Sequence, residues 1–136
     1  MAFIQGTTRD DDLHGTGGRD TITGGSGDDT INGSGGRDVL IGGGGSDLFV
    51  FDNTNDVDDV RDFSLNQGDM IGLDADIFSA LGLAGDSVDF GGEYLYYASG
   101  SGNLIYDADG QGGALGIAFA HVGSGINFSD SDFVLL

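Results

Sequence analysis

The sequence predicts an all-β fold, in which a spiral of short parallel strands is closed at one end by a C-terminal β extension. Two observations support this prediction. Residues 6–50 divide into five consecutive nonapeptides that share one pattern, and the later chain carries short apolar runs and most of the aromatic residues. We expect residues 1–56 to form the spiral, and residues 57–136 to form a cap that packs on it as one unit.

The five nonapeptides share three columns. Glycine occupies the first position of every unit. An apolar residue occupies each eighth position, namely Leu13, Ile22, Ile31, Leu40 and Phe49. Aspartate occupies each sixth position, namely Asp11, Asp20, Asp29, Asp38 and Asp47. Because strand side chains alternate between two faces, each unit predicts a three-residue strand with one inward apolar residue, preceded by a glycine-rich turn.

The aspartate column indicates a metal site. Aspartates at the same place in successive turns would stack about 4.8 Å apart, and like charges at that spacing repel. The chain has no lysine to separate them. A hard divalent cation held by carboxylate and carbonyl oxygens would neutralise the stack, and Ca²⁺ suits an irregular oxygen cage better than Mg²⁺. An acidic, solvated turn is the alternative, and five matches in phase favour the metal.

The pattern Gly-Gly-x-Gly-x-Asp-x-U-x, where U is apolar, is complete in GGSGDDTIN and GGGGSDLFV. It resembles the RTX (hemolysin-type) calcium-binding repeat. The resemblance implies a right-handed parallel β-roll with two nonapeptides per coil, so that aspartates one coil apart share an ion. The implied pairs are Asp11 with Asp29, Asp29 with Asp47, and Asp20 with Asp38. Asp56 keeps the phase and could pair with Asp38, although Asp58 then stands in the apolar column.

The resemblance also implies backbone ligands and a number of ions. The implied carbonyl donors are those of Gly18, Gly24, Gly25, Ser26, Gly27, Gly33, Gly35, Gly36, Gly42, Gly43 and Gly45. Together with the aspartates they would hold about three to four calcium ions. Thr7 and Arg9 replace glycines in the first repeat, so we expect a weak or distorted site there.

Composition excludes several other functions. Asp+Glu number 23 against 4 Lys+Arg, and a formal charge of −19 repels a nucleic-acid backbone. The absence of cysteine excludes disulfides and zinc–thiolate sites. The apolar runs are too short for a transmembrane helix, and the first residues show no N-terminal signal peptide.

The four cations are all arginines, and two of them share a column. Arg19 and Arg37 occupy the fifth position of alternate repeats, so they should stack on one edge, while Asp10 and Asp28 stack on the other. Charge compensation beside the calcium rows is the favoured interpretation. The alternative is a small arginine patch for an anionic polysaccharide. The rival function is then a carbohydrate-binding module, similar to the repeat modules of bacterial alginate epimerases. An adhesin tail is a third possibility.

The C-terminal extension should add strands at 69–73, 94–97, 104–106, 117–122 and 133–136, with a short helix near 77–81. Apolar residues at 39, 41, 48 and 50 predict that the extension covers the last coil. The ending Asp132-Phe133-Val134-Leu135-Leu136 is similar to the uncleaved secretion signal of proteins exported by the type I route, and it also suits a core strand. The segment Asp107-Ala108-Asp109-Gly110 suits a solvated turn better than an EF-hand loop.

Catalytic signals are weak. His14 suits an exposed strand position, His121 suits a hydrogen-bonded strand residue, and no G-x-S-x-G or H-E-x-x-H motif occurs. The sequence therefore predicts a non-enzymatic domain. The resemblance implies that this domain binds calcium and folds on Ca²⁺, that it is secreted and extracellular, and that the type I secretion machinery is its partner. A polysaccharide-binding module and an adhesin tail are the rival predictions.

Overall fold

The computed structural model describes residues 1–110 and 116–136. The repeat region forms seven short strands: β1 (Phe3–Gln5), β2 (Asp12–His14), β3 (Thr21–Thr23), β4 (Thr30–Asn32), β5 (Val39–Ile41), β6 (Leu48–Phe51) and β7 (Asp58–Val60). The extension adds β8 (Met70–Leu73), β9 (Leu95–Ala98), β10 (Asn103–Tyr106), β11 (Ile117–His121) and β12 (Phe133–Leu135). Three 3-10 helices lie between them: η1 (Leu65–Gln67), η2 (Ser79–Leu81) and η3 (Asp130–Asp132).

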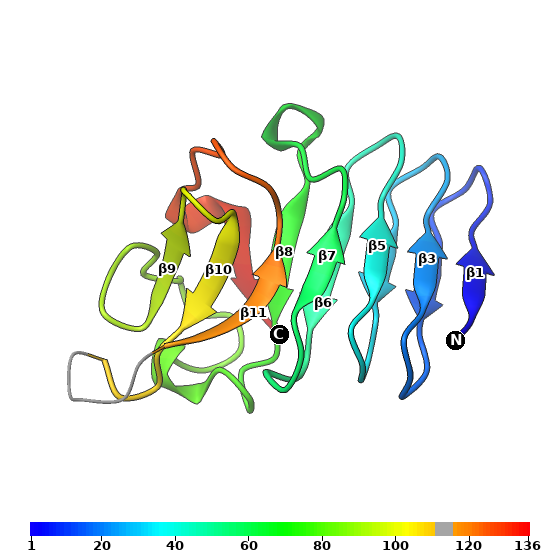
Figure 1. Ribbon diagram of the computed structural model, residues 1–136. Coiled ribbons are helices and arrows are strands. Elements are labelled where there is room, and N and C mark those ends of the chain that lie inside the picture. Colours follow the sequence, from blue (N-terminus) through cyan, green and yellow to red (C-terminus); the bar gives the residue numbers. More distant parts are fainter. Residues whose placement is uncertain (111–115) are drawn as a thin grey trace.

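The strands of the repeat region alternate between two parallel sheets. One sheet has the order β1-β3-β5-β7-β11-β10-β9, and the other has the order β12-β8-β6-β4-β2 (Figure 1). Ile22 lies opposite Ile4 and Leu40, and Ile31 lies opposite Leu13 and Phe49. Each coil of the repeats therefore takes eighteen residues, or two nonapeptides. The predicted fold class, a parallel β-roll capped by a β extension, is confirmed.

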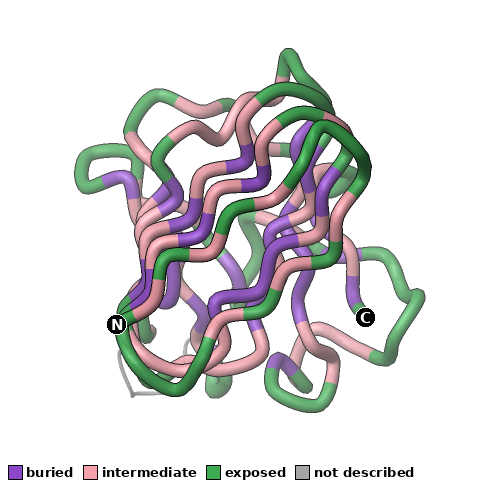
Figure 2. Tube along the Cα trace, turned by 90° about the vertical axis from the view of Figure 1, so that its right-hand side faces the viewer, coloured by how far each residue is buried: buried purple, intermediate pink, exposed green. Residues whose placement is uncertain are grey.

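The core of the roll is the column of eighth-position residues. Ile22, Ile31, Leu40 and Phe49 are fully buried between the two sheets. Ile4 and Leu13 are only half-buried, because the first coil has no neighbour on its outer side. Figure 2, which looks along the stack of coils, shows buried positions in the strands and exposed positions at the corners.

The extension closes the far end of the roll by continuing both sheets. β11 pairs parallel with β7, the β9–β10 hairpin follows antiparallel, and β12 pairs parallel with β8. Its aromatic side chains pack on the last coil, where Phe119 contacts Phe51 with ring centroids 5.4 Å apart. The predicted strands of the extension are confirmed within one or two residues, and the hairpin turns at 99–102. The division at residue 56 stays a prediction, since both sheets run across it.

The predicted short helix near 77–81 is shorter than expected. Only the three-residue η2 forms there, after a turn in which the N–H groups of Ile77 and Phe78 both donate to the carbonyl oxygen of Asp74. Gly82 has φ 128°, a left-handed conformation that ends the helical turn at once. Over the residues described, no helix has the length and apolar character needed to cross a bilayer.

Candidate metal centre

The sixth-position aspartates form a hydrogen-bonded ladder along each edge of the roll. In each step the backbone N–H of one aspartate donates to Oδ1 of the aspartate one coil later, at 2.8 or 2.9 Å. The steps join Asp11 to Asp29, Asp20 to Asp38, Asp29 to Asp47, Asp38 to Asp58, and Asp47 to Asp69. The structure thus brings together all three aspartate pairs expected within the five repeats.

The expected place of Asp56 in this ladder is wrong. Asp58 occupies the ladder position above Asp38, and Val60 takes the inward apolar position. The coil lengthens to twenty residues here and to twenty-two at the next step, where Asp69 follows Asp47. A strict nine-residue period therefore no longer predicts the ladder position beyond Asp47. The local motif Asp-x-apolar, as in Asp58-Asp59-Val60 and Asp69-Met70-Ile71, would have found both residues.

The second carboxylate oxygen, Oδ2, separates the ladder into two groups. In the first two repeats a threonine caps it: the N–H and hydroxyl of Thr7 donate to Asp11, and those of Thr16 donate to Asp20. In the next three repeats Oδ2 is buried and accepts no hydrogen bond from the residues described; these atoms belong to Asp29, Asp38 and Asp47. The three side chains are at most 2 % exposed, so water does not replace the missing donors.

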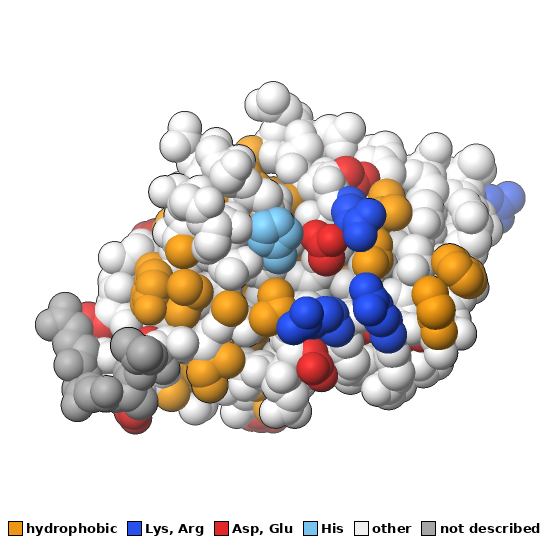
Figure 3. All heavy atoms as spheres, viewed as in Figure 1, with side chains coloured by type: hydrophobic (Ala, Val, Ile, Leu, Met, Phe, Trp, Pro, Cys, Tyr) orange, Lys and Arg blue, Asp and Glu red, His pale blue; other side chains and the backbone are white. Residues whose placement is uncertain are grey.

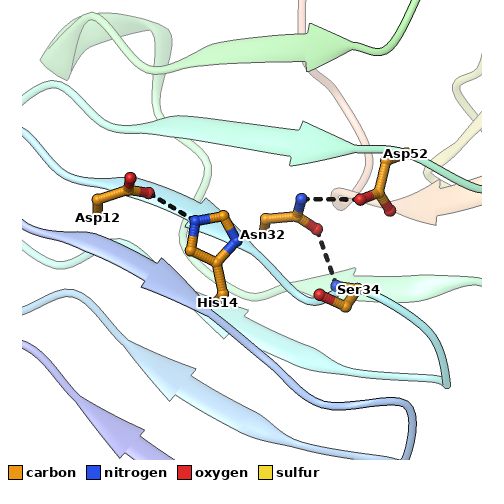
Figure 4. Close-up of polar contacts among 5 residues, drawn as sticks. All are labelled: Asp12, His14, Asn32, Ser34 and Asp52. Atoms are coloured by element: carbon orange, nitrogen blue, oxygen red, sulfur yellow. Dashed lines mark hydrogen bonds and ion pairs between the residues drawn. The ribbon is translucent and has the colours of Figure 1, made fainter. Parts of the chain in front are cut away.

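The residue at the second position of each repeat causes this difference. Gly25 and Gly43 have φ 99° and 87°, and Ser34 has φ 65°, a left-handed conformation that the threonines do not adopt. The Ser34 N–H donates instead to Oδ1 of Asn32, at 2.8 Å. As Figure 4 shows, the Asn32 amide also donates to Asp52, at 3.0 Å. Asn32 itself is buried.

Backbone carbonyl oxygens of neighbouring coils lie close to the glycines of the turns, and one of them lies near an unpartnered carboxylate. A Cβ added at Gly24 would lie 2.5 Å from Asp29 Oδ2 and 2.6 Å from the carbonyl oxygen of Gly42 in the next coil. Six of the predicted carbonyl donors would likewise be in close contact with a Cβ added to a glycine of an adjacent coil: Gly18, Gly24, Gly25, Gly27, Gly33 and Gly42. The other predicted donors occupy the same turns, and their ligand role stays a prediction: Ser26, Gly35, Gly36, Gly43 and Gly45.

Burial sets the protonation of the ladder. It raises the pKa of Asp47 to about 6 and the pKa of Asp58 to about 7, and neighbouring carboxylates add to both shifts. Burial also raises the pKa values of Asp29, Asp38 and Asp69. The pKa of Asp20 is lowered instead, because the Thr16 N–H donates to its carboxylate.

These donors fit a calcium ion. Two carboxylates from adjacent coils and several carbonyls give an all-oxygen set, which Ca²⁺ prefers. In the described part of the chain no three His, Asp or Glu side chains converge on one point, so a cation here would take most of its ligands from the backbone. Buried carboxylate oxygens without a hydrogen-bond partner destabilise the fold, and a bound cation would offset this cost.

The other residues singled out in the sequence lie apart from the ladder. His14 is exposed and its Nε2 lies 3.0 Å from Asp12 Oδ1 on the same strand (Figure 4). His121 is half-buried and its Nδ1 lies 2.9 Å from Asn103 Oδ1. The Asp107 segment forms a turn in which the N–H of Asp109 donates to Asp107 Oδ1. On the opposite edge from Arg19 and Arg37, Asp10 and Asp28 stack as expected.

The match to a family model agrees with the repeat geometry. The family model of the RTX calcium-binding nonapeptide repeat matches residues 5–40 and 25–58. The chain is also similar to a solved structure, the solution structure of the AlgE6R3 subunit from the Azotobacter vinelandii mannuronan C5-epimerase, at 26% identity and a TM-score of 0.44, covering 95% of this chain and 80% of that one. The comparison with curated proteins gives no match. Residues 5–58 of this chain therefore match the RTX calcium-binding nonapeptide repeat.

Proposed function

We propose that this chain is a non-catalytic module that calcium folds outside the cell, and that it serves the type I export of the protein that carries it. The three buried Oδ2 atoms of Asp29, Asp38 and Asp47, which have no hydrogen-bond donor, are the observation that carries the proposal. A fold that buries anionic oxygens without partners needs a cation to be stable.

The energetics favour an unfolded chain when calcium is absent. Two carboxylates about 4.8 Å apart repel by roughly 3 kcal/mol at an effective dielectric constant near 20. The glycine-rich turns also lose much conformational entropy on ordering. Calcium removes the repulsion and supplies ligand bonds, so its binding free energy becomes folding free energy.

We assign three calcium ions to the pairs whose first carboxylate is uncapped. These pairs are Asp29 with Asp47, Asp38 with Asp58, and Asp47 with Asp69. The charge of Asp56 acts on both Asp38 and Asp58, and that of Asp62 acts on Asp47 and Asp69. Asp56 thus keeps a supporting role beside the ladder. The pairs that begin at Asp11 and Asp20 are weaker sites, because threonine donors already occupy those carboxylates.

The C-terminal strand supports the export part of the proposal. Phe133 and Leu135 are buried, and β12 is hydrogen-bonded to β8. A secretion signal in this segment is therefore accessible only while the chain is unfolded. Low cytosolic calcium would keep the chain in that state, and calcium near the 10⁻⁴–10⁻³ M range of extracellular modules would fold it afterwards.

Far-ultraviolet circular dichroism of the purified chain tests the proposal. We expect an unfolded spectrum in excess chelator and a β-sheet spectrum when calcium is added, with magnesium much less effective. A β-sheet spectrum in chelator that calcium leaves unchanged would contradict the folding role. Export is tested separately, by secretion of a reporter fused to this chain with and without residues 133–136 from a host that has a type I exporter. Equal export of the two fusions would show that residues 133–136 are not a secretion signal.

A further inference from the structure

We propose that Asn32 is a site of spontaneous deamidation, at which the unfolded chain is modified and the calcium-bound fold is protected. Asn32 precedes Gly33, and this is the only Asn-Gly step in the sequence. Glycine has no side chain to shield its backbone nitrogen and adopts many conformations, so this peptide bond can attack the preceding amide more readily than any other in the chain. The protection by calcium rests on the proposed folding role, whereas the modification itself does not.

The reaction consumes water and needs no other reactant. The backbone nitrogen of Gly33 loses its proton and forms a bond to Cγ of Asn32, the Cγ–Nδ2 bond breaks, and ammonia leaves with that proton. The product is a five-membered imide. Water then attacks either of its two carbonyl carbons, and residue 32 becomes aspartate or isoaspartate, in which the main chain runs through the side-chain carboxyl carbon. No atom is oxidised or reduced.

The fold holds the Asn32 side chain in an unreactive state. Asn32 ends β4 and is 8 % exposed. Its Oδ1 accepts the Ser34 N–H at 2.8 Å, and its Nδ2 donates to Asp52 Oδ2 at 3.0 Å (Figure 4). Its backbone carbonyl accepts the Gly15 N–H at 2.8 Å. Closing the imide ring releases Nδ2 and requires ψ of Asn32 to leave the strand region, so the reaction must wait for local opening of the turn.

The modification would disturb the turn that ends at Asp38. Aspartate at position 32 lacks the Nδ2 donor and places a second carboxylate beside Asp52, whose charge already acts on Asp58. Isoaspartate adds one carbon to the main chain next to Gly33, where even a Cβ would collide with Asp38 Oδ2. Both products therefore act on the calcium site assigned to Asp38 and Asp58, and they should lower its affinity.

Most of the positive charge lies on the sheet to which Asn32 does not belong. Three of the four arginines line a hollow on the outer face of the seven-stranded sheet, whereas Asn32 is part of the five-stranded sheet (Figure 3). The residues of this hollow include Arg19, Arg37, Arg61, Asn103 and His121. A carboxylate at position 32 would therefore face the carboxylate of Asp52, and the two would repel each other.

Incubation of the purified full chain at mildly alkaline pH tests the proposal, because base removes the Gly33 proton. One sample contains saturating calcium, one contains excess chelator, and one contains chelator with guanidinium chloride, which unfolds the chain whatever calcium does. Peptide mass spectrometry follows the replacement of NH₂ by OH, and chromatography separates the isoaspartyl peptide. We expect modification at residue 32 to be at least about tenfold faster in denaturant than in calcium, because only the open turn reacts.

Asn127 is the internal control, since it is exposed in the fold but precedes a phenylalanine. It should react slowly in all three samples. Equal rates at Asn32 in calcium and in denaturant, or a rate in denaturant no faster than that of Asn127, would overturn the proposal. The chelator sample separates it from the folding role. A chelator rate that matches the denaturant rate supports protection by calcium, and one that matches the calcium rate would overturn the calcium dependence and leave protection by the fold alone.

Matched aspartate variants measure the consequence of the modification. N32D reproduces one product, and N127D adds the same charge at an exposed position. N32D should raise the calcium concentration for half-folding several-fold, because its carboxylate repels Asp52, and N127D should leave it nearly unchanged. Circular dichroism during calcium titration gives both midpoints. An N32D midpoint equal to that of the native chain would contradict the expected damage to the calcium site.

Discussion

The first two repeats and the next three contain the same aspartate column but treat it differently. Thr16 donates two hydrogen bonds to Asp20 and the pKa of Asp20 falls, whereas Asp47 is buried with an unpartnered Oδ2 and its pKa rises to about 6. The residue at the second position decides which state occurs. Aspartates at the same repeat position therefore differ in the role of Oδ2. It accepts hydrogen bonds in the first two repeats and is a candidate calcium ligand in the next three, and the residue at the second position makes the difference.

The largest predicted effect comes from removing a carboxylate that two uncapped pairs share. D47N should raise the calcium concentration for half-folding by about tenfold or more, because ligand charge sets calcium affinity in such sites. D11N removes the corresponding charge from a capped pair and should shift this midpoint far less. Circular dichroism during calcium titration measures both. Equal shifts in the two variants would show that the threonine caps do not distinguish the sites.

Glycine at the first position should be the next most sensitive feature. A Cβ at Gly24 would collide with Asp29 Oδ2 and the Gly42 carbonyl, whereas a Cβ at Gly44 would meet nothing within 4 Å. We expect G24A to lose about 1–3 kcal/mol of calcium-bound stability through overpacking, and G44A to change little. Urea unfolding at fixed calcium gives both values. A neutral G24A would mean that the coils are spaced more widely than described.

Protonation of the buried aspartates at low pH should partly replace the stabilising effect of calcium. The pKa values of Asp47 and Asp58 are raised to about 6 and about 7, so between the ordinary carboxyl pKa and these values the folded chain binds more protons than the unfolded chain. Stability without metal therefore falls as pH rises through this window. In chelator, lowering the pH from about 8 to about 5 should stabilise the fold, while calcium affinity decreases. Far-ultraviolet circular dichroism in chelator across this range measures the folded fraction, and a folded fraction that increases with pH would contradict the assignment of raised pKa values.

The smallest predicted effect is the gain of a calcium site. T16G removes the cap from Asp20 and restores the complete repeat pattern in GTGGRDTIT. We expect one additional calcium ion per chain, shared by Asp20 and Asp38, with little change in overall stability. Equilibrium dialysis followed by metal analysis counts the ions. Unchanged stoichiometry would show that threonine at this position does not exclude calcium.

The nine-residue period was sufficient to predict the strands and the inward column, and the resemblance to the RTX repeat implied the pairing of Asp29 with Asp47. It succeeded because each column of a repeat has one structural role in every coil. It failed at Asp58 and Asp69, where the coils lengthen and counting from the start loses register. The sequence showed Thr7 only as a replaced glycine, and the cap at Thr16 was not predicted. Arg19 and His121 line the same hollow because β11 pairs with β7. The repeat pattern gives no indication of that pairing.

Anomalous diffraction from crystals grown in calcium is the most direct measurement of where charge is neutralised. The account predicts ions beside Oδ2 of Asp29, Asp38 and Asp47, each coordinated mainly by backbone carbonyl oxygens, and weaker or absent density beside Asp11 and Asp20. Density that shows those three carboxylates bonded to water or backbone N–H groups, with no metal between the coils, would contradict it.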